Sequence, residues 1–228
     1  MLKPLSQLYN NTMENILRTV PTIKLNDLQV SLDFGWAFQE HVQKYNYGES
    51  YWQNYINIED TPTANLLNEF RSNIAEKYAD SILDMGIGSG AFLKALKSNK
   101  YGYDVNPYAI EWLKEQKIYH DPYNSDNEGI NGFCCWDVIE HMQNPSEFLA
   151  IIPPKAHLFI SLPVFNDLEM VHLSKHYKPN EHLFYFTTKG MIKFLEISGF
   201  TIKELRSDET QIGREKIMTF VSQKNHDR

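Results

Sequence analysis

Residues 81–90 read Ser-Ile-Leu-Asp-Met-Gly-Ile-Gly-Ser-Gly, and residues 101–104 read Tyr-Gly-Tyr-Asp. The first stretch predicts a short strand that ends at Asp84, a glycine loop, and a helix that begins at Ala91. The second predicts the next strand, which ends at Asp104. A glycine loop lets a ligand touch the main chain, and an acid after the next strand can accept both hydrogen bonds of a ribose diol. The glycines alone are also typical of a tight turn without a ligand, so the pairing with Asp104 is what predicts a nucleoside site.

The same alternation continues along the chain. Helices are expected after the capping residues Thr61 or Thr63, over 108–116, over 145–152 and over 187–197, and strands over 118–120, 132–136, 157–162, 200–205 and 216–221. Strict alternation predicts the α/β class, with a doubly wound and mostly parallel sheet covered by helices on both faces. Ligands of such folds bind beyond the carboxyl ends of the strands.

The first 60 residues lie outside this pattern. We expect an N-terminal helical extension over 1–60, ahead of a ligand-binding domain over 61–228. Aromatic residues are dense from Tyr45 to Tyr55 and lack the alternation of a strand. Two interpretations of this segment stay open at this point: a helix that docks on the core or on a second copy of the chain, and a lid over the ligand site.

Composition excludes several classes of protein. The chain has 228 residues, of which 42% are hydrophobic and 22% charged, and no apolar run approaches the ~20 residues that cross a bilayer. The N-terminus lacks the apolar core of a secretory signal. The net charge of −7 disfavours a nucleic-acid partner. The adjacent Cys134 and Cys135 predict core packing rather than a disulfide or a zinc site, as expected in a cytoplasmic compartment.

The kind of nucleoside ligand follows from the surroundings of the loop. Gly86, Gly88 and Ala91 nearly satisfy the G-x-G-x-x-G/A pattern of NAD-binding and FAD-binding proteins. Asp84, however, would repel a pyrophosphate and suits the cationic end of a sulfonium-bearing ligand. Only about 140 residues follow the loop, too few for the substrate domain of a dehydrogenase. An NAD-linked oxidoreductase is therefore the weaker interpretation.

Five stretches in order carry a resemblance to a known family: ILDMGIGSG at 82–90, GYDVNP at 102–107, CWDVIEH at 135–141, ISLP at 160–163 and HLFYFTTKGMIKFLEISGF at 182–200. The chain resembles the class I S-adenosylmethionine-dependent methyltransferases over residues 65–223. The resemblance implies a seven-stranded sheet whose last strand is antiparallel. It also implies a cofactor site formed by Asp84, Gly86, Gly88, Gly90, Asp104, Asp121, Trp136 and Asp137.

The most reactive cluster is Asp137-x-x-Glu140-His141. It resembles the E-x-x-E-H sequence of metal-assisted O-methyltransferases, in which His182 would match a later histidine, so Asp137, Glu140, His141 and His182 could hold a divalent ion such as magnesium. The other interpretation is a helix start whose His141 packs beside the cofactor, with no metal. The segment 164–186 adds His172, His176 and His182, and His141 and His182 are the candidate catalytic bases.

The sequence thus predicts a methyltransferase that uses S-adenosylmethionine. The expected acceptor is a small molecule, methylated at a hydroxyl, because the acidic balance disfavours nucleic acid and no segment suits a membrane. A different class stays open, namely a binding module without catalysis that serves regulation or assembly. The sequence does not indicate the oligomeric state.

Overall fold

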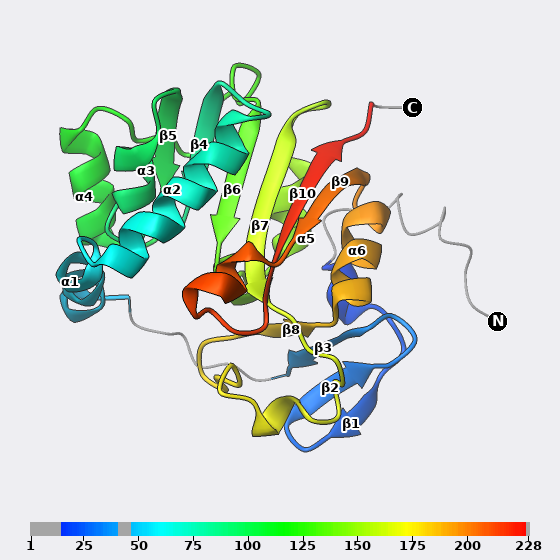
Figure 1. Cartoon of the computed structure of the whole chain (residues 1–228). Helices are drawn as coiled ribbons and strands as arrows, with labels where there is room; N and C mark the ends of the chain where they lie inside the picture. The colour runs from blue at the N-terminus through cyan, green and yellow to red at the C-terminus, as the bar shows by residue number, and fades with distance from the viewer. Residues whose placement is uncertain (1–14, 41–46, 227–228) are drawn as a thin grey trace.

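The computed structural model describes residues 15–40 and 47–226 (Figure 1). Within them, the main sheet has six strands in the order β5 (Asn99–Tyr103), β4 (Ser81–Met85), β6 (Gly132–Trp136), β7 (His157–Pro163), β10 (Ile217–Lys224) and β9 (Phe200–Arg206). The first four run parallel, and β10 is antiparallel to both of its neighbours. The predicted doubly wound α/β class with an antiparallel last strand is confirmed.

The strand expected at 118–120 is reduced to a parallel bridge between Gly102 and Tyr119. It lies beside β5, where a seventh strand would add to the sheet. Lys117 before it has a positive φ of 60°, and Pro122 after it has no amide hydrogen to donate to a neighbouring strand. These two boundaries leave room for only a few extended residues.

Helices cover both faces of the main sheet, as predicted. α2 (Pro62–Glu76), α3 (Ala91–Ala95) and α4 (Pro107–Glu115) pack on one face, in a core that includes Cys134. α5 (Pro145–Ala150) and α6 (Thr188–Ile197) pack on the other, in a core that includes Cys135. Both cysteines are free and buried, which confirms that they are core residues. The Thr61 hydroxyl accepts from the amide of Ala64, so Thr61 is the cap of α2.

The N-terminal segment differs from the helical extension that we expected. Its described part forms three strands, β1 (Ile23–Leu25), β2 (Leu28–Ser31) and β3 (Trp36–Gln39), which join β8 (Phe184–Phe186) in a four-stranded antiparallel sheet. Helical structure is confined to a short 3-10 turn at Ile16–Arg18 and to α1 (Glu49–Ile58). The physical reason is burial: every residue of β3 is buried, which a surface helix cannot achieve. Tyr45, part of the predicted aromatic segment, lies outside the described residues.

The small sheet lies beyond the carboxyl ends of the parallel strands (Figure 1). It is built from two distant parts of the chain, because β8 comes from the segment 164–186 that follows β7. α1 lies at the same end of the main sheet, near α3 and α4 (Figure 1). The N-terminal segment and the insertion therefore flank the edge where ligands of this fold bind. No described helix has the length and apolarity needed to cross a membrane.

Candidate active site

The glycine loop forms one wall of a cleft of about 440 Å³ at this edge. Gly86 and Gly88 have positive φ values of 74° and 54°, which favour glycine because other residues are strained there. A Cβ atom on Gly88 would lie 3.0 Å from the ring of Tyr55 in α1, so this helix covers the loop closely. The volume is within the ~300–1,000 Å³ range of small-ligand sites.

Asp84 lies at the base of the cleft with its side chain almost fully buried. Its Oδ1 atom has no hydrogen-bond partner among the described residues. Burial raises the pKa of Asp84 well above its usual value, although the charge of Arg71 opposes this. A buried carboxyl group with an unused oxygen suits a cationic ligand, since a positive charge beside it stabilises the carboxylate form.

Not all of the predicted cofactor residues line the cleft. Those that do are Asp84, Gly86, Gly88, Trp136 and Asp137. Gly90 serves the packing of the loop, because a Cβ atom there would lie 2.6 Å from the ring of Trp112. Asp104 accepts from the amide of Asn106 at 2.8 Å, and burial raises its pKa. Asp121 accepts from the amide of Tyr123 and the side chain of Asn124 in its own turn.

Asp137 belongs to a network of ion pairs in the cleft wall. Its carboxylate accepts from Arg71 at 3.0 Å and from Arg214 at 2.8 Å. Both arginines also pair with the fully buried Glu209, and Ser161 donates to Glu209 at 2.9 Å. Burial alone would raise the pKa of Asp137, but the two arginines outweigh it and lower the pKa to about 2. The negative charge of Asp137 is therefore balanced by two arginines of the protein itself.

Arg71, Glu209 and Arg214 are residues that sequence reasoning missed. The guanidinium of Arg71 also lies 4.9 Å from the ring of Trp136, whose buried Nε1 has no hydrogen-bond partner among the described residues. An arginine on the buried face of an otherwise amphipathic helix was the available signal, because such a charge needs a partner. Its position in the sequence did not indicate which acid that partner would be.

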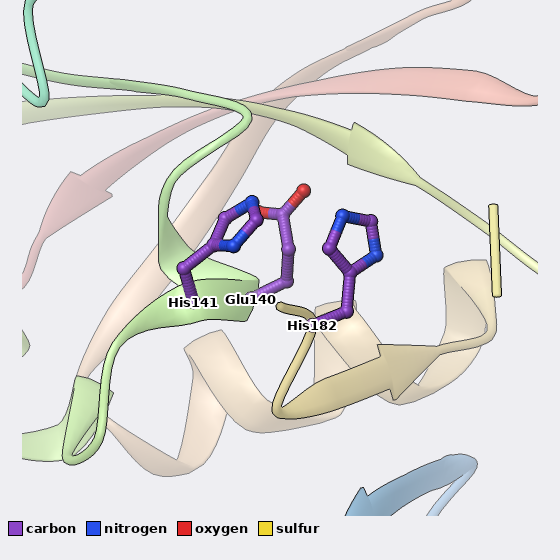
Figure 2. Close-up of side chains that lie close together, drawn as sticks. All are labelled: Glu140, His141 and His182. Carbon is purple, nitrogen blue, oxygen red and sulfur yellow. The ribbon is translucent and has the colours of Figure 1, made fainter. Parts of the chain in front are cut away.

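Glu140, His141 and His182 also line the cleft, and their side chains lie close together (Figure 2). One ligand-capable atom of each lies within 4.8 Å of those of the other two. Glu140 and His141 come from the 3-10 turn after β6, and His182 comes from the segment before β8. The amide of Leu183 donates to the carbonyl of Glu140 at 2.8 Å, which joins these two parts. Asp137, which the sequence grouped with these residues, does not join them.

The two histidines are neutral at pH 7. Burial lowers the pKa of His141, although Glu181 opposes the change. Burial and the neighbouring His141 lower the pKa of His182 to about 3. Burial and the charge of Asp137 raise the pKa of Glu140. The cluster therefore presents imidazole nitrogens with free lone pairs to the cleft, as a base or a metal ligand requires.

The remaining histidines of the insertion have other contacts. His176 lines the cleft, but its Nε2 pairs with the carbonyl of Glu215 at 2.9 Å. His172 is exposed and lies 3.4 Å from the side chain of Asn26. Of the three histidines in the insertion, the structure brings only His182 next to His141, and their ring centroids are 4.6 Å apart.

The family model described as a methyltransferase domain matches residues 58–205, more than half of the chain. The chain therefore belongs to this family and is an S-adenosylmethionine-dependent methyltransferase. No curated protein matches the sequence. The expected family and the expected enzyme class are confirmed.

Solved structures share the fold at low identity. A methyltransferase from Archaeoglobus fulgidus, described as SAM dependent, is 15% identical with a TM-score of 0.55, over 75% of this chain and 99% of that one. The plantazolicin methyltransferase BpumL, solved with S-adenosylhomocysteine, is 17% identical with a TM-score of 0.52, over 78% and 90%. The cyclase SpnF is 14% identical with a TM-score of 0.54, over 72% and 82%. These likenesses concern the fold, which does not fix the acceptor.

The residues present fit the cofactor of the family. The unpartnered buried oxygen of Asp84 suits the ammonium of the methionine part, and the left-handed glycines leave the loop open to close contact. Trp136 offers an aromatic surface on the same wall of the cleft.

Proposed function

We propose that the protein methylates a hydroxyl group of a small molecule, and that His141 and His182 bind this hydroxyl in the cleft. The observation that carries the proposal is that both histidines line the same cleft as Asp84 and the glycine loop. A single cleft of about 440 Å³ that must hold both a cofactor and an acceptor favours a small acceptor. The net charge of −7 also disfavours a polyanion.

The chemistry needs alignment more than it needs a strong base. When bound, S-adenosylmethionine supplies a methyl group on a sulfonium with a good leaving group. The protein holds the methyl donor and the acceptor in line, and this alignment lowers the activation barrier by up to ~7–11 kcal/mol. In the proposed arrangement Asp84 and the glycine loop hold the cofactor, Trp136 borders it, and the two histidines hold the acceptor hydroxyl. The histidines also ease removal of the hydroxyl proton because their nitrogens are unprotonated at pH 7.

A thermal-shift titration tests the cofactor first. At ~100 times its dissociation constant, a ligand adds ~2.7 kcal/mol to the free energy of unfolding, so S-adenosylhomocysteine should raise the melting temperature measurably. NAD serves as the control and should leave it unchanged. Stabilisation by NAD alone would overturn the proposal in favour of an oxidoreductase.

Methyl transfer from radiolabelled S-adenosylmethionine to pools of small alcohols and phenols tests the acceptor. His141→Ala and His182→Ala should each lower turnover by 10²-fold or more, as expected for loss of acid–base assistance. His172→Ala, an exposed histidine of the same insertion, should leave turnover unchanged. Full turnover in both cleft variants contradicts the assigned role, and binding of cofactor without any transfer supports a binding module.

A further inference from the structure

Glu140 has a buried carboxylate with no visible counter-group. Its residue is 1% exposed, and neither carboxylate oxygen has a hydrogen-bond partner among the described residues. An ionised carboxylate in such a place costs several kcal/mol unless a cation or a donor compensates it. The two cations whose charges act on Glu140 are already engaged elsewhere: Lys178 pairs with Glu181 at 3.3 Å, and Arg214 pairs with Asp137 and Glu209. The carboxylate of Glu140 therefore lacks a compensating cation.

The two histidines beside it are arranged as nitrogen donors. His141 Nδ1 lies 3.0 Å from the carbonyl oxygen of Glu181, and a carbonyl can only accept. The proton is therefore on Nδ1, and Nε2 carries the lone pair. Such a bond to the second ring nitrogen is the usual support of a metal-binding histidine. The two rings are perpendicular, and Figure 2 shows the Glu140 carboxylate between them.

The backbone fixes this group of side chains from both sides. Gln39 of β3 donates to the carbonyl of His182 at 2.6 Å and to the hydroxyl of Tyr185 at 3.0 Å. The amide of Leu183 binds the carbonyl of Glu140. These bonds hold His182 and Glu140 next to each other before any ligand binds, which lowers the cost of assembling a site.

From this arrangement we propose that Glu140, His141 and His182 bind one divalent transition-metal ion, of the Mn²⁺, Fe²⁺, Co²⁺ and Zn²⁺ class, with its remaining coordination positions open to the cleft. Ligand atoms on a tetrahedral ion with bonds of about 2.0–2.2 Å lie ~3.3–3.6 Å apart. The three ligand atoms lie within 4.8 Å of one another, so they need to approach one another by at most ~1.5 Å to bind one ion. Two imidazoles and one carboxylate favour these metals, whereas Mg²⁺ prefers oxygen ligands and water. Asp137 is excluded as a fourth ligand because Arg71 and Arg214 hold it.

The open positions give the ion a role in the proposed function, on which this last step rests. The lone pairs of His141 and His182 then bind the ion, and the ion takes the place of the two rings in holding the acceptor hydroxyl. An acceptor hydroxyl bound to the ion is more acidic than a free one, so it loses its proton to solvent at neutral pH. The resulting oxygen attacks the methyl group, the new C–O bond forms as the C–S bond breaks, and the neutral thioether leaves with the electron pair. The metal keeps its oxidation state, and the balance is one proton released for each methyl transferred.

Metal binding is tested without an activity assay. The tag-free chain is treated with a chelator, and calorimetric titrations with Zn²⁺, Mn²⁺ and Mg²⁺ follow, with Co²⁺ absorption as a second readout. We expect one transition-metal ion per chain and at least 100-fold weaker binding of Mg²⁺. Glu140→Gln and His182→Gln should each weaken Zn²⁺ binding by 10-fold to 100-fold or more, whereas His172→Ala should not change it.

The possible results test the metal site, the class of metal and the proposed function separately. No transition-metal binding in the parent chain, or equal binding in the parent and both cleft variants, overturns the metal site. Mg²⁺ affinity equal to that of Zn²⁺ overturns the metal class. Titration of each variant with S-adenosylhomocysteine shows whether the variant is folded. If the cofactor binds and no metal does, the metal inference fails and the proposed function stands; if metal binds and the cofactor does not, the proposed function fails.

Discussion

At the scale of single residues, the network around Asp137 and Glu209 joins buried charges that depend on one another. Arg71 is 8% exposed at its side chain, and its partner Glu209 is fully buried. Arg71→Ala should lower the free energy of unfolding by ~3–5 kcal/mol, because it leaves a buried charge without one of its partners. Urea denaturation measures this loss.

The control for Arg71 is an ion pair at the surface. Lys175 pairs with Glu215 at 2.8 Å, but both side chains are more than half exposed. Lys175→Ala should therefore cost less than ~1 kcal/mol. If the two substitutions cost the same, the buried network does not stabilise the fold in the way the distances imply.

The same network predicts a dependence on pH. The folded-state pKa of Asp137 is about 2, below the usual ~3.9 of a free aspartate. A lowered pKa contributes stability that is fully present above about pH 4 and is lost as the pH falls towards 2. The difference in unfolding free energy between the parent chain and Asp137→Asn should thus shrink across this window. A difference that stays constant from pH 6 to pH 3 would contradict the assigned pKa.

Some residues of the site could be predicted from the sequence, and the buried ion pairs of this network could not. Asp84, Gly86, Gly88, His141 and His182 could be picked because each follows a strand end or a recognisable motif, and all of them line the cleft. Arg71 and Glu209 could not be paired because 138 positions separate them and no local pattern links them. Only the folding of α2 against the loop before β10 brings them together.

At the scale of elements, α1 behaves as a cover of the glycine loop. None of its residues is buried, yet Tyr55 lies against Gly88 and lines the cleft. Tyr55→Ala should weaken S-adenosylhomocysteine binding about 5-fold to 10-fold, which corresponds to the ~1–1.4 kcal/mol of a partly exposed aromatic contact. Isothermal titration calorimetry measures it.

Asn54 offers the matched control on the same helix, since it is exposed and does not line the cleft. Asn54→Ala should bind the cofactor as the parent chain does. If Tyr55→Ala also binds it unchanged, α1 is a docked extension and the lid interpretation fails.

The strands of the N-terminal segment were missed for a physical reason. A half-buried strand alternates buried and exposed residues, but all four residues of β3 are buried and β1 is mostly exposed, so neither shows period two. One local signal was present. Asn26, in the left-handed conformation with φ 55°, and Asp27 form the two-residue connection between β1 and β2, which is typical of a hairpin.

At the scale of the whole molecule, the main sheet could be predicted because its strands and helices alternate in sequence. The small sheet could not, because β3 and β8 are distant in sequence and their pairing becomes visible only in the folded chain. This pairing has a consequence for the domain boundary that we predicted at residue 60. The N-terminal segment shares a core with the rest of the molecule, so we expect that it does not fold as a separate unit.

A fragment of residues 58–228, which begins where the family match begins, should therefore fail to fold. In the full chain Trp36 is fully buried, its Nε1 donates to the carbonyl of Leu17 at 2.9 Å, and it pairs with Phe186 across the small sheet. Removing β3 exposes Phe184, Phe186 and an unpaired strand edge, which promotes aggregation. It also removes the bonds from Gln39 that hold His182. Circular dichroism and size-exclusion chromatography of both chains measure the effect. A fragment that stays monomeric and melts cooperatively at the temperature of the full chain would show that the small sheet is dispensable, and that residues 61–228 form a complete domain.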